Sequence, residues 1–570
     1  MGSLLASLGM TASSPRHVLV AVAWPYANGV QHLGHLAGCY LPSDIFARYH
    51  RIAGNRVLMV SGSDGHGTPI MVKAEQEGVQ PSDIVDQFHP QIVEQWDRLG
   101  ISFDLFTTTM TDNHREVVWD LFRDLHAKGL IDTKVTEQFY DPEAGRFLPD
   151  RYVEGTCPNC GYENARGDQC DNCSKTLDPT DLIDPRSKFS GATPEPRETE
   201  HYFILLPKLA DELLTWLEGR EGWRNHVINW ALGFVREGLI DRAITRDLTW
   251  GVPIPPELDT IGEGKAIYVW FEAVIGYLSA AKEWASQTGD PDAWKAWWEN
   301  PDAESYYFIG KDNIPFHAVF WPTYLLGYSQ GRTPETGALN LPTNVPANQY
   351  VTFKGEKASK SRGIGTPVLD YLDTWTPDQL RYALAANLPE YTDTDISEEE
   401  LVRRANDELA NGWGNLVNRV FGMTHKNFDG VMPEAGELDD EDRALLETVD
   451  RLLAEMAVQL EKVELRAGLR LALEIAQETN AYLNTKTPWK TAKTDLARTG
   501  TTLHVALQAI SGAAVAFAPY TPFSSATVRG WLGLDEYLVG HGWHRDEVPA
   551  GTQLGETVVL FPKIELEPVD

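Results

Sequence analysis

The chain has 570 residues, and at about 150 residues per domain this length predicts roughly four folding units. Apolar residues make up 42% of it and charged residues 23%, a balance that excludes a disordered or collagen-like chain. The formal net charge of −33 excludes a coat that binds nucleic acid by charge alone, so any nucleic acid must dock on local basic patches or by its shape.

The N-terminal half alternates strand-like and helix-like segments. Residues 1–14 are expected to be a flexible leader and not an export signal, because no charged residue precedes their short apolar stretch. Residues 17–23 (HVLVAVA) and 56–60 (RVLMV) predict buried strands, with a helix between them that ends near Gly54. Pro42 lies inside that helix and should kink or split it. Strand, helix and strand at this spacing predict a βαβ unit and hence a parallel sheet.

The rest of the chain changes from sheet to helix. Residues 130–265 are rich in turn residues and interrupt the sheet, which resumes at 306–309 (YYFI). From residue 401 onward, apolar residues recur every three or four positions, which predicts a helical bundle. Its most apolar window, 503–522, is broken by polar residues, so we expect a cytoplasmic protein without a membrane segment. Residues 557–561 hold one last strand-like run.

Two histidines follow the first strand in the segment PYANGVQHLGH. His32 and His35 flank Gly34 where a helix should begin, and the free N–H groups and dipole of a helix start favour phosphate. Gly34 would let a nucleotide approach the backbone, while both imidazoles can donate to phosphate oxygens. Taken alone, the segment could equally be two ordinary histidines at a helix N-terminus.

A basic cluster, KGEKASKSR at residues 354–362, stands out in this acidic chain. Its glycine, serine and lysine content predicts a mobile loop. By itself the cluster could be a solvated charge run. Together, in this order and about 320 residues apart, the two candidate phosphate segments are more significant than either one alone.

Four of the five cysteines form two C-x₂-C knuckles: Cys157, Cys160, Cys170 and Cys173. Four thiolates can close a tetrahedral site, for which Zn²⁺ is the usual ion, and disulfides are uncommon in a cytoplasmic chain. We expect one structural zinc per chain, because four protein ligands leave no open position for catalysis.

The bundle carries a polar stripe beside its apolar one. Asn411, Asn415 and Arg419 lie at positions i, i+4 and i+8. From the residues alone these side chains form a solvated helix face, and Trp489 is a core tryptophan near a helix cap.

The two phosphate segments and their surroundings resemble the class I aminoacyl-tRNA synthetases, and within them the methionyl-tRNA synthetases. The resemblance rests on PYANGVQHLGH, SGSDGHGTPI, YVWFEAVIGY, FIGKDNIPFH and KASKSRG, and it spans about residues 17–530. It implies an α/β fold, with a Rossmann-like parallel-sheet catalytic domain, an inserted zinc-knuckle subdomain and an all-α anticodon-binding bundle. The implied parts are a leader at 1–14, the catalytic domain at 15–129 and 266–345, the inserted connective subdomain at 130–265, a lysine-loop and stem-contact region at 346–400, the bundle at 401–540 and a tail at 541–570.

The resemblance implies that the chain adenylates methionine with Mg²⁺-ATP and then transfers the methionyl group to the terminal adenosine of tRNA(Met), the initiator included. His32 and His35 would stabilise the α-phosphate, and Lys357 and Lys360 the departing pyrophosphate. Gly310 and Asp312 match the nucleoside-binding positions of the family. No DNA or membrane is implied as a partner, and the absence of an appended C-terminal domain favours a monomer.

The methionine site and the anticodon site follow from the same resemblance. Asp64 is the expected partner of the substrate ammonium group. The positions that match the rest of the methionine site are Tyr26, Trp270, Ala273, Tyr277 and His317, and those that match the anticodon contacts are Asn415, Arg419 and Trp489. A mostly aromatic wall suits a polarizable thioether.

Four residues depart from the usual family pattern: Trp24, Ala358, Glu272 and Val274. Two other functions compete with a tRNA ligase: a nucleotidyl transferase that uses no tRNA, and a non-catalytic zinc-bearing RNA-binding protein. The bundle with its polar stripe argues against the first, and the two intact phosphate segments argue against the second.

Overall fold

The computed structural model describes residues 15–149, 152–167, 169–173, 175, 177–353 and 367–565, and the backbone of 356–357. A five-stranded sheet lies at its centre with the order β15-β14-β1-β2-β3, every neighbouring pair parallel. Its strands are β1 (His17–Val22), β2 (Arg56–Ser63), β3 (Leu105–Thr108), β14 (Glu304–Gly310) and β15 (Ala347–Asn348). β1 is buried along almost its whole length, which explains its continuous apolar run. The strands predicted at 17–23, 56–60 and 306–309 are confirmed.

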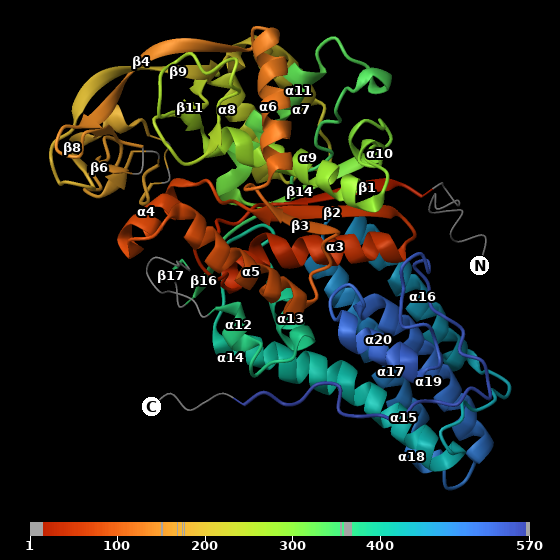
Figure 1. The fold of residues 1–570 in the computed structure, drawn as a ribbon. Coiled ribbons are helices and arrows are strands. Elements are labelled where there is room, and N and C mark those ends of the chain that lie inside the picture. The colour runs from red at the N-terminus through yellow and green to blue at the C-terminus, as the bar shows by residue number, and fades with distance from the viewer. Residues whose placement is uncertain are drawn as a thin grey trace.

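Helices cover both faces of this sheet, as a parallel sheet requires. Figure 1 shows α3 and α5 on one side and α6 and α9 on the other. The helices of this part are α3 (Leu41–Ile52), α4 (Thr68–Glu77), α5 (Pro81–Leu99), α6 (Asp112–Ala127), α9 (Val269–Thr288), α10 (Lys295–Trp298) and α11 (Trp321–Ser329).

The helical segment after β1 is split, as Pro42 predicts. A short α2 (Leu33–His35) leads into the π-helical turn η1 (Leu36–Tyr40), and α3 begins only at Leu41, with Pro42 in its first turn. Proline has no N–H to donate to the carbonyl group four residues earlier, which belongs to Gly38. The side-chain amide of Asn348 donates to that carbonyl instead, at 2.7 Å.

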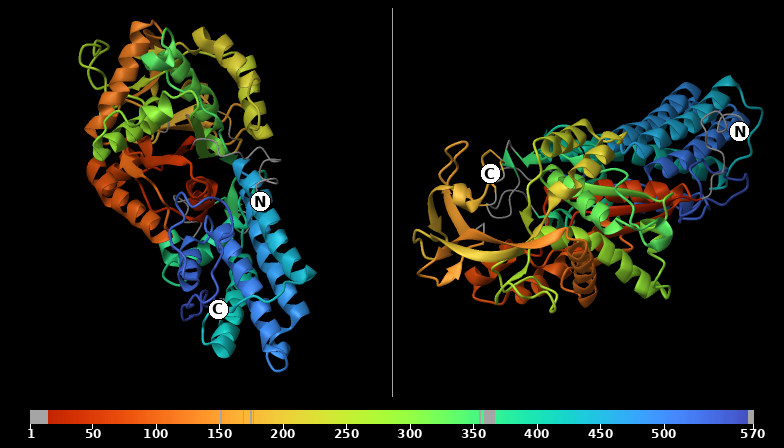
Figure 2. Two further views of the ribbon diagram at one scale, coloured as in Figure 1. Left: turned by 90° about the vertical axis from the view of Figure 1, so that its right-hand side faces the viewer. Right: turned by 90° about the horizontal axis from the view of Figure 1, so that it is seen from above.

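The first part of the interruption of the sheet forms a separate lobe, which lies at the opposite end of the molecule from the helical bundle in the right view of Figure 2. A long antiparallel ribbon, β4 (Ile131–Asp141) with β9 (Glu195–Ile204), extends from the catalytic part to a small sheet that holds the cysteines. The small sheet has the order β7-β6-β8: β6 (Val153–Thr156), β7 (Ala165–Arg166) and β8 (Ile183–Ser187). The chain then returns through α7 (Ala210–Glu218) and α8 (Asn225–Arg236) and the short strands β10 (Arg242–Ala243), β11 (Thr245–Arg246), β12 (Val252–Pro253) and β13 (Ala266–Ile267).

After the catalytic part, α12 (Val368–Tyr371) and α13 (Pro377–Ala385) lead into the predicted bundle. Its helices are α14 (Glu398–Arg403), the π-helical η9 (Arg404–Gly414), α15 (Asn415–Phe428), α16 (Asp440–Glu461), α17 (Leu465–Lys486), α18 (Pro488–Thr491), α19 (Leu496–Phe517) and α20 (Pro522–Trp531). Of the helices in the described part of the chain, α19 alone is long and apolar enough to cross a membrane, but 94% of that stretch is buried inside the protein, as in a core helix.

The prediction of a strand at residues 557–561 is wrong. This segment is irregular, and Phe561 is buried against Gly414 of the bundle instead of pairing with a strand.

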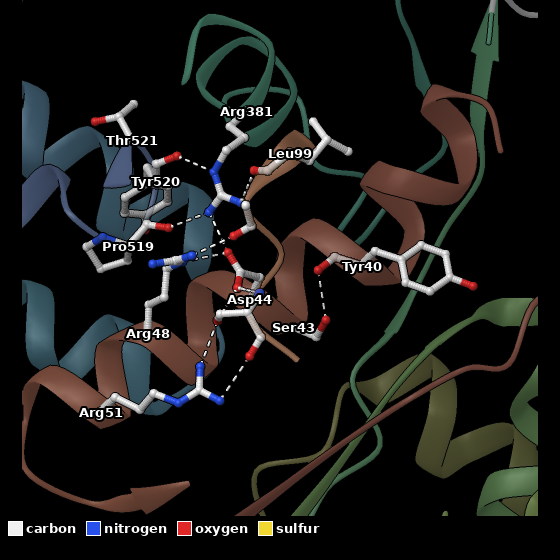
Figure 3. A network of polar contacts seen from close by, with 12 residues as sticks. Tyr40, Ser43, Asp44, Arg48, Arg51, Leu99, Arg381, Pro519, Tyr520 and Thr521 are labelled. Carbon is white, nitrogen blue, oxygen red and sulfur yellow. Dashed lines mark hydrogen bonds and ion pairs between the residues drawn. The ribbon is translucent and has the colours of Figure 1, made fainter. Parts of the chain in front are cut away.

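A fully buried ion pair joins the catalytic part to the bundle (Figure 3): Arg381 on α13 contacts Asp44 on α3 at 2.6 Å. The same guanidinium group donates to the backbone carbonyls of Pro519 and Tyr520 at the end of α19.

Candidate active site and metal centre

The predicted substrate residues meet where β1, β2 and β14 end. Parallel strands present their carboxyl ends at one edge, and the order reverses between β1 and β14, which is where doubly wound sheets bind ligands. Tyr26 and Asp64 follow β1 and β2 and form a parallel bridge there. The amide of Asp64 donates to the carbonyl of Pro25 at 2.8 Å, and the amide of Ala27 donates to the carbonyl of Asp64 at 2.9 Å.

His32 and His35 begin the first helix after β1, as predicted, and their rings lie 3.8 Å apart. The Nδ1 atom of His32 accepts the backbone N–H of Gly34 at 3.1 Å, and the Nδ1 atom of His35 accepts that of His32 at 3.3 Å. A neutral imidazole with an acceptor Nδ1 carries its proton on Nε2. Both rings can therefore donate from Nε2.

The basic cluster is described only in part. Lys360 and Ala358 lie outside the described residues. The backbone of Lys357 belongs to the short strand β17 (Glu356–Lys357), which pairs antiparallel with β16 (Val351–Phe353), so this position lies in a hairpin strand and not in the predicted loop. Directly after the cluster, Pro367 forms a bridge with His32, and the amide of Val368 donates to the carbonyl of Gln31 at 3.1 Å. The chain after the second predicted phosphate segment is thus bonded directly to the first.

Gly310 lies at the end of β14 and Asp312 just beyond it, at the same edge. Gly310 is the last residue of β14, pairs with Asn348 and precedes the 3₁₀ turn η5 (Lys311–Asn313) that holds Asp312. The hydroxyl group of Tyr350 donates to the carboxylate of Asp312. This hydroxyl–carboxylate contact shows that Asp312 can accept a hydroxyl donor, the property expected of a group that binds ribose.

Three predicted methionine-site residues share one face of α9. Trp270, Ala273 and Tyr277 are spaced i, i+3 and i+7, so the helix places them in one row. The hydroxyl group of Tyr277 lies 2.7 Å from Nε2 of His317, on η6 (Phe316–Phe320). Because Nδ1 of His317 lies 2.9 Å from the carbonyl of Asn313, to which it must donate, Nε2 is the acceptor for Tyr277. Burial lowers the pKa of His317 to about 4, so the ring is neutral at pH 7.

The indole of Trp270 stacks on a residue that the sequence did not single out. Its ring lies 4.1 Å from that of Phe316, with 9° between the planes. Together the two rings add flat, polarizable surface beside the pair formed by Tyr277 and His317. The part of the site that should take a thioether is therefore aromatic, and its ionisable groups there are neutral.

Asp64 is buried, with 4% of its surface exposed, and its carboxylate accepts the backbone N–H of His66 at 3.1 Å. Burial and the neighbouring carboxylate of Glu272 raise the pKa of Asp64 well above its ordinary value. Glu272 is itself fully buried, but hydrogen bonds with His114 and His66 outweigh burial and lower its pKa. No pattern in the sequence pointed to His114, which lies on α6, nearly 160 residues before Glu272.

The departure at Trp24 has a structural counterpart in two glycines. A Cβ on Gly62 would lie 2.5 Å from the indole of Trp24, and a Cβ on Gly276 would lie 2.8 Å from it. The indole ring also lies 6.1 Å from that of His114. Trp24, Glu272 and His114 thus belong to one cluster next to Asp64. Val274, the other departure on α9, is buried in the core.

The four clustered cysteines could hold the predicted metal ion. All four sulfur atoms lie within 4.8 Å of one another, and the Sγ–Sγ distances are 3.9 Å for Cys157 and Cys173 and 3.6 Å for Cys160 and Cys170. Four sulfurs about 2.3 Å from a tetrahedral zinc lie about 3.8 Å apart, whereas a disulfide has an S–S bond of about 2.05 Å. Hydrogen bonds from the backbone of Lys175 and the side chain of Asn159 lower the pKa of Cys173 to about 6, toward the thiolate form that a metal requires. The residues fit a structural Zn²⁺.

Two of the predicted anticodon residues meet at the far end of the bundle. The guanidinium carbon of Arg419, on α15, lies 5.7 Å from the ring centre of Trp489 on α18, and Arg419 donates to the side chain of Asn480 at 2.8 Å. Trp489 is 40% exposed, so its interpretation as a core tryptophan is wrong. Asn415 is exposed one turn before Arg419 on the same helix. The three side chains form a surface with an aromatic face, a cation and an amide.

Comparison with known protein families accounts for nearly all of the described chain. Residues 18–421 match the family of class I tRNA synthetases (M), and residues 432–570 match the anticodon binding domain of methionyl tRNA ligase. The methionine–tRNA ligase of Thermobifida fusca is 52% identical over 527 residues, which cover 91% of this chain and 87% of that protein. That of Corynebacterium jeikeium is 47% identical over 599 residues, covering 97% and 98%.

Solved structures give the same result. The methionyl-tRNA synthetase of Mycobacterium tuberculosis bound by methionyl-adenylate superposes with a TM-score of 0.78 at 26% identity, covering 96% of this chain and 100% of that one. Its apo form superposes with a TM-score of 0.71, covering 98% and 100%.

Proposed function

The chain belongs to the methionine-specific class I tRNA synthetases, and from this membership we propose how its residues ligate methionine to tRNA. It is a methionine–tRNA ligase. The observation that carries the proposal is the bridge between Pro367, in the chain that follows the second phosphate segment, and His32 in the first, at the edge where β1, β2 and β14 end.

In the first step, the methionine carboxylate attacks the α-phosphate of ATP, and pyrophosphate leaves. The carboxylate is already a nucleophile, so the site needs to stabilise charge and not to remove a proton. The Nε2–H groups of His32 and His35 are assigned to the α-phosphate, and Lys357 and Lys360 to the pyrophosphate. Gly310 allows the nucleoside to approach the backbone, and Asp312 accepts the ribose hydroxyls. Mg²⁺ bound to ATP would neutralise part of the triphosphate charge.

The methionine site selects its substrate at both ends. The carboxylate of Asp64 takes the ammonium group, with Tyr26 beside it. Trp270, Ala273 and Tyr277 surround the thioether, and the hydrogen bond from Tyr277 to neutral His317 keeps both polar groups satisfied inside an apolar wall. An apolar wall with neutral polar groups disfavours charged side chains, which would lose their hydration without gaining a partner.

In the second step, a hydroxyl group of the terminal adenosine of tRNA(Met), the initiator included, attacks the methionyl carbonyl and AMP leaves. Trp489 stacks on an anticodon base, while Asn415 and Arg419 donate to base edges. Zn²⁺, held by Cys157, Cys160, Cys170 and Cys173, would fix the fold of the inserted lobe. These substrates are those of cytoplasmic translation, which supports a cytoplasmic location. The monomeric state stays a prediction, which light scattering of the purified protein would test.

Charging of a tRNA(Met) transcript with radiolabelled methionine tests the proposal. We expect ATP-dependent formation of methionyl-tRNA, and a loss of several orders of magnitude when the anticodon of the transcript is replaced, since the bundle would then lose its base contacts. Equal charging of the two transcripts would contradict the role proposed for the bundle, and no charging of either would contradict the proposed function.

A further inference from the structure

A buried polar cluster lies directly behind Asp64, and the proposed function gives it no task. It consists of His66, His114 on α6, and Glu272 and Ser279 on α9. The exposed fractions of the four residues are 8%, 1%, 0% and 1%. Ionisable groups are costly to bury unless they are paired, so their arrangement calls for a physical reason.

The hydrogen bonds fix where the protons are. The hydroxyl group of Ser279 donates its one proton to the carbonyl of Gly276 at 3.0 Å, so toward His114 it can only accept, and Nδ1 of His114, 2.8 Å away, must be the donor. Nε2 of His114 lies 2.6 Å from one oxygen of Glu272, and Nδ1 of His66 lies 3.2 Å from the other. One proton is therefore shared between Nε2 of His114 and Glu272. With Nδ1 of His114 already protonated, the pair has no net charge wherever that shared proton lies.

We propose that His114 is a positioning residue for methionine binding: it neutralises the buried carboxylate of Glu272, so that Asp64 can ionise and hold the substrate ammonium group. The inference rests on the role of Asp64 in the proposed function. Without His114, two carboxylates would share one buried site, and like charges at close range strongly disfavour ionisation of one of them. A protonated Asp64 cannot pair with an ammonium group as an anion does.

The other charged groups around the cluster do not supply this neutralisation. Glu283, also on α9, interacts with His114, but it is a further acid; Thr107 donates to it at 2.9 Å, and burial raises its pKa. Asp112 and Arg115 line a cavity of about 120 Å³ together with His66, and they pair with each other at 2.8 Å. Two histidines face Glu272, and His114 is the closer: its Nε2 atom lies 2.6 Å from the carboxylate, against 3.2 Å for Nδ1 of His66. His114 is therefore the group best placed to offset Glu272. The indole of Trp24, 6.1 Å from the imidazole, adds a face that favours a cation.

The test is a double-mutant cycle of His114 and Glu272 that removes their charges. The measured quantity is the KM for methionine in ATP–pyrophosphate exchange between pH 6 and pH 9. H114Q keeps a donor for Glu272 but removes the positive charge. We expect its KM for methionine at pH 7 to rise about tenfold or more, because loss of the positive charge should raise the pKa of Asp64 by at least one unit. The KM should approach the wild-type value toward pH 9, where Asp64 ionises. The double variant H114Q/E272Q removes both charges and should return within about threefold of wild type at every pH. The KM for ATP should not change in either variant.

An unchanged methionine KM in H114Q would overturn the inference. A pH-independent rise that E272Q does not correct would overturn it too, because it would mean that His114 only packs. If H114Q fails to fold, S279A, which frees the His114 ring from its Nδ1 acceptor, should raise the KM in the same direction with the same pH dependence. D64N separates this inference from the proposed function: if D64N leaves methionine KM unaltered, Asp64 does not bind the ammonium group and the proposed site itself is wrong.

Discussion

Replacing Arg381 by methionine should destabilise the whole chain, because Arg381 joins the catalytic part to the bundle (Figure 3). Its guanidinium group and the carboxylate of Asp44 are both fully buried and 2.6 Å apart. Removing one partner of a buried pair costs about 3–5 kcal/mol, since the other charge stays buried and unpaired. Arg48 still contacts Asp44 at 2.8 Å, so we expect the lower end for this pair, about 3 kcal/mol. Each carbonyl that loses its donor, at Leu99, Pro519 and Tyr520, adds about 1 kcal/mol or more.

The assay is urea unfolding of wild type, R381M and the matched control R48M. Arg48 contacts the same carboxylate but is 24% exposed, so its loss should cost clearly less. If R381M is no less stable than R48M, the buried junction does not hold the two parts together and the reasoning is wrong.

The same junction predicts a dependence on pH. Burial alone would raise the pKa of Asp44, but Arg48, Arg381 and the hydrogen bonds from Ser102 outweigh burial and hold it well below its ordinary value. A carboxyl group with a lowered folded-state pKa stabilises the protein above its unfolded pKa of about 4, and this contribution is lost as the pH falls further. The difference in the free energy of unfolding between wild type and R381M should therefore have its full size at pH 6 and decrease below about pH 4.

Three further outcomes test the assigned roles. Lys360→Ala should lower the rate of methionine activation by about 10²–10³-fold, as the loss of one preorganised donor does, with little change in methionine affinity without ATP; near-normal pyrophosphate exchange would exclude the role. Elemental analysis should find about one zinc per chain, and Cys173→Ser should weaken charging of tRNA more than adenylation, whereas a zinc-free protein with full activity would show that the knuckle needs no metal. Trp489→Ala should lower methionyl transfer by the equivalent of about 1–3 kcal/mol while pyrophosphate exchange stays near wild type, since Trp489 lies on the bundle; equal loss of both activities would point to a structural role.

Much of the fold could be predicted because it depends on local patterns. The apolar runs that became β1, β2 and β14 are buried on both faces, and such strands have no polar alternation that could be mistaken for another element. Pro42 broke its helix because a missing N–H acts locally. The apolar run at 557–561 led to a wrong prediction of a strand, because Phe561 is buried by packing on Gly414, in a helix far away in the sequence.

The site residues also differ in whether the sequence alone could predict them. The cysteine cluster could be found because the spacing of its two knuckles sets its geometry. The signature histidines and the row on α9 were instead found through the resemblance of their segments to the family. His114 could not be found, since its role depends on Glu272, nearly 160 residues later, and on the crossing of α6 and α9. The residues alone misplaced Trp489 in the core for a similar reason, whereas the resemblance placed it among the anticodon contacts: the sequence shows that it is aromatic but not that the short helix α18 leaves it on the surface near Arg419.

The measurement that tests the central claim most directly is ATP–pyrophosphate exchange without tRNA, run with each of the twenty amino acids in turn. The aromatic and neutral methionine site proposed for Trp270, Tyr277 and His317, with Asp64 at its other end, predicts that methionine alone supports rapid exchange. Exchange with another amino acid at a comparable kcat/KM, or with none of the twenty, would contradict the account.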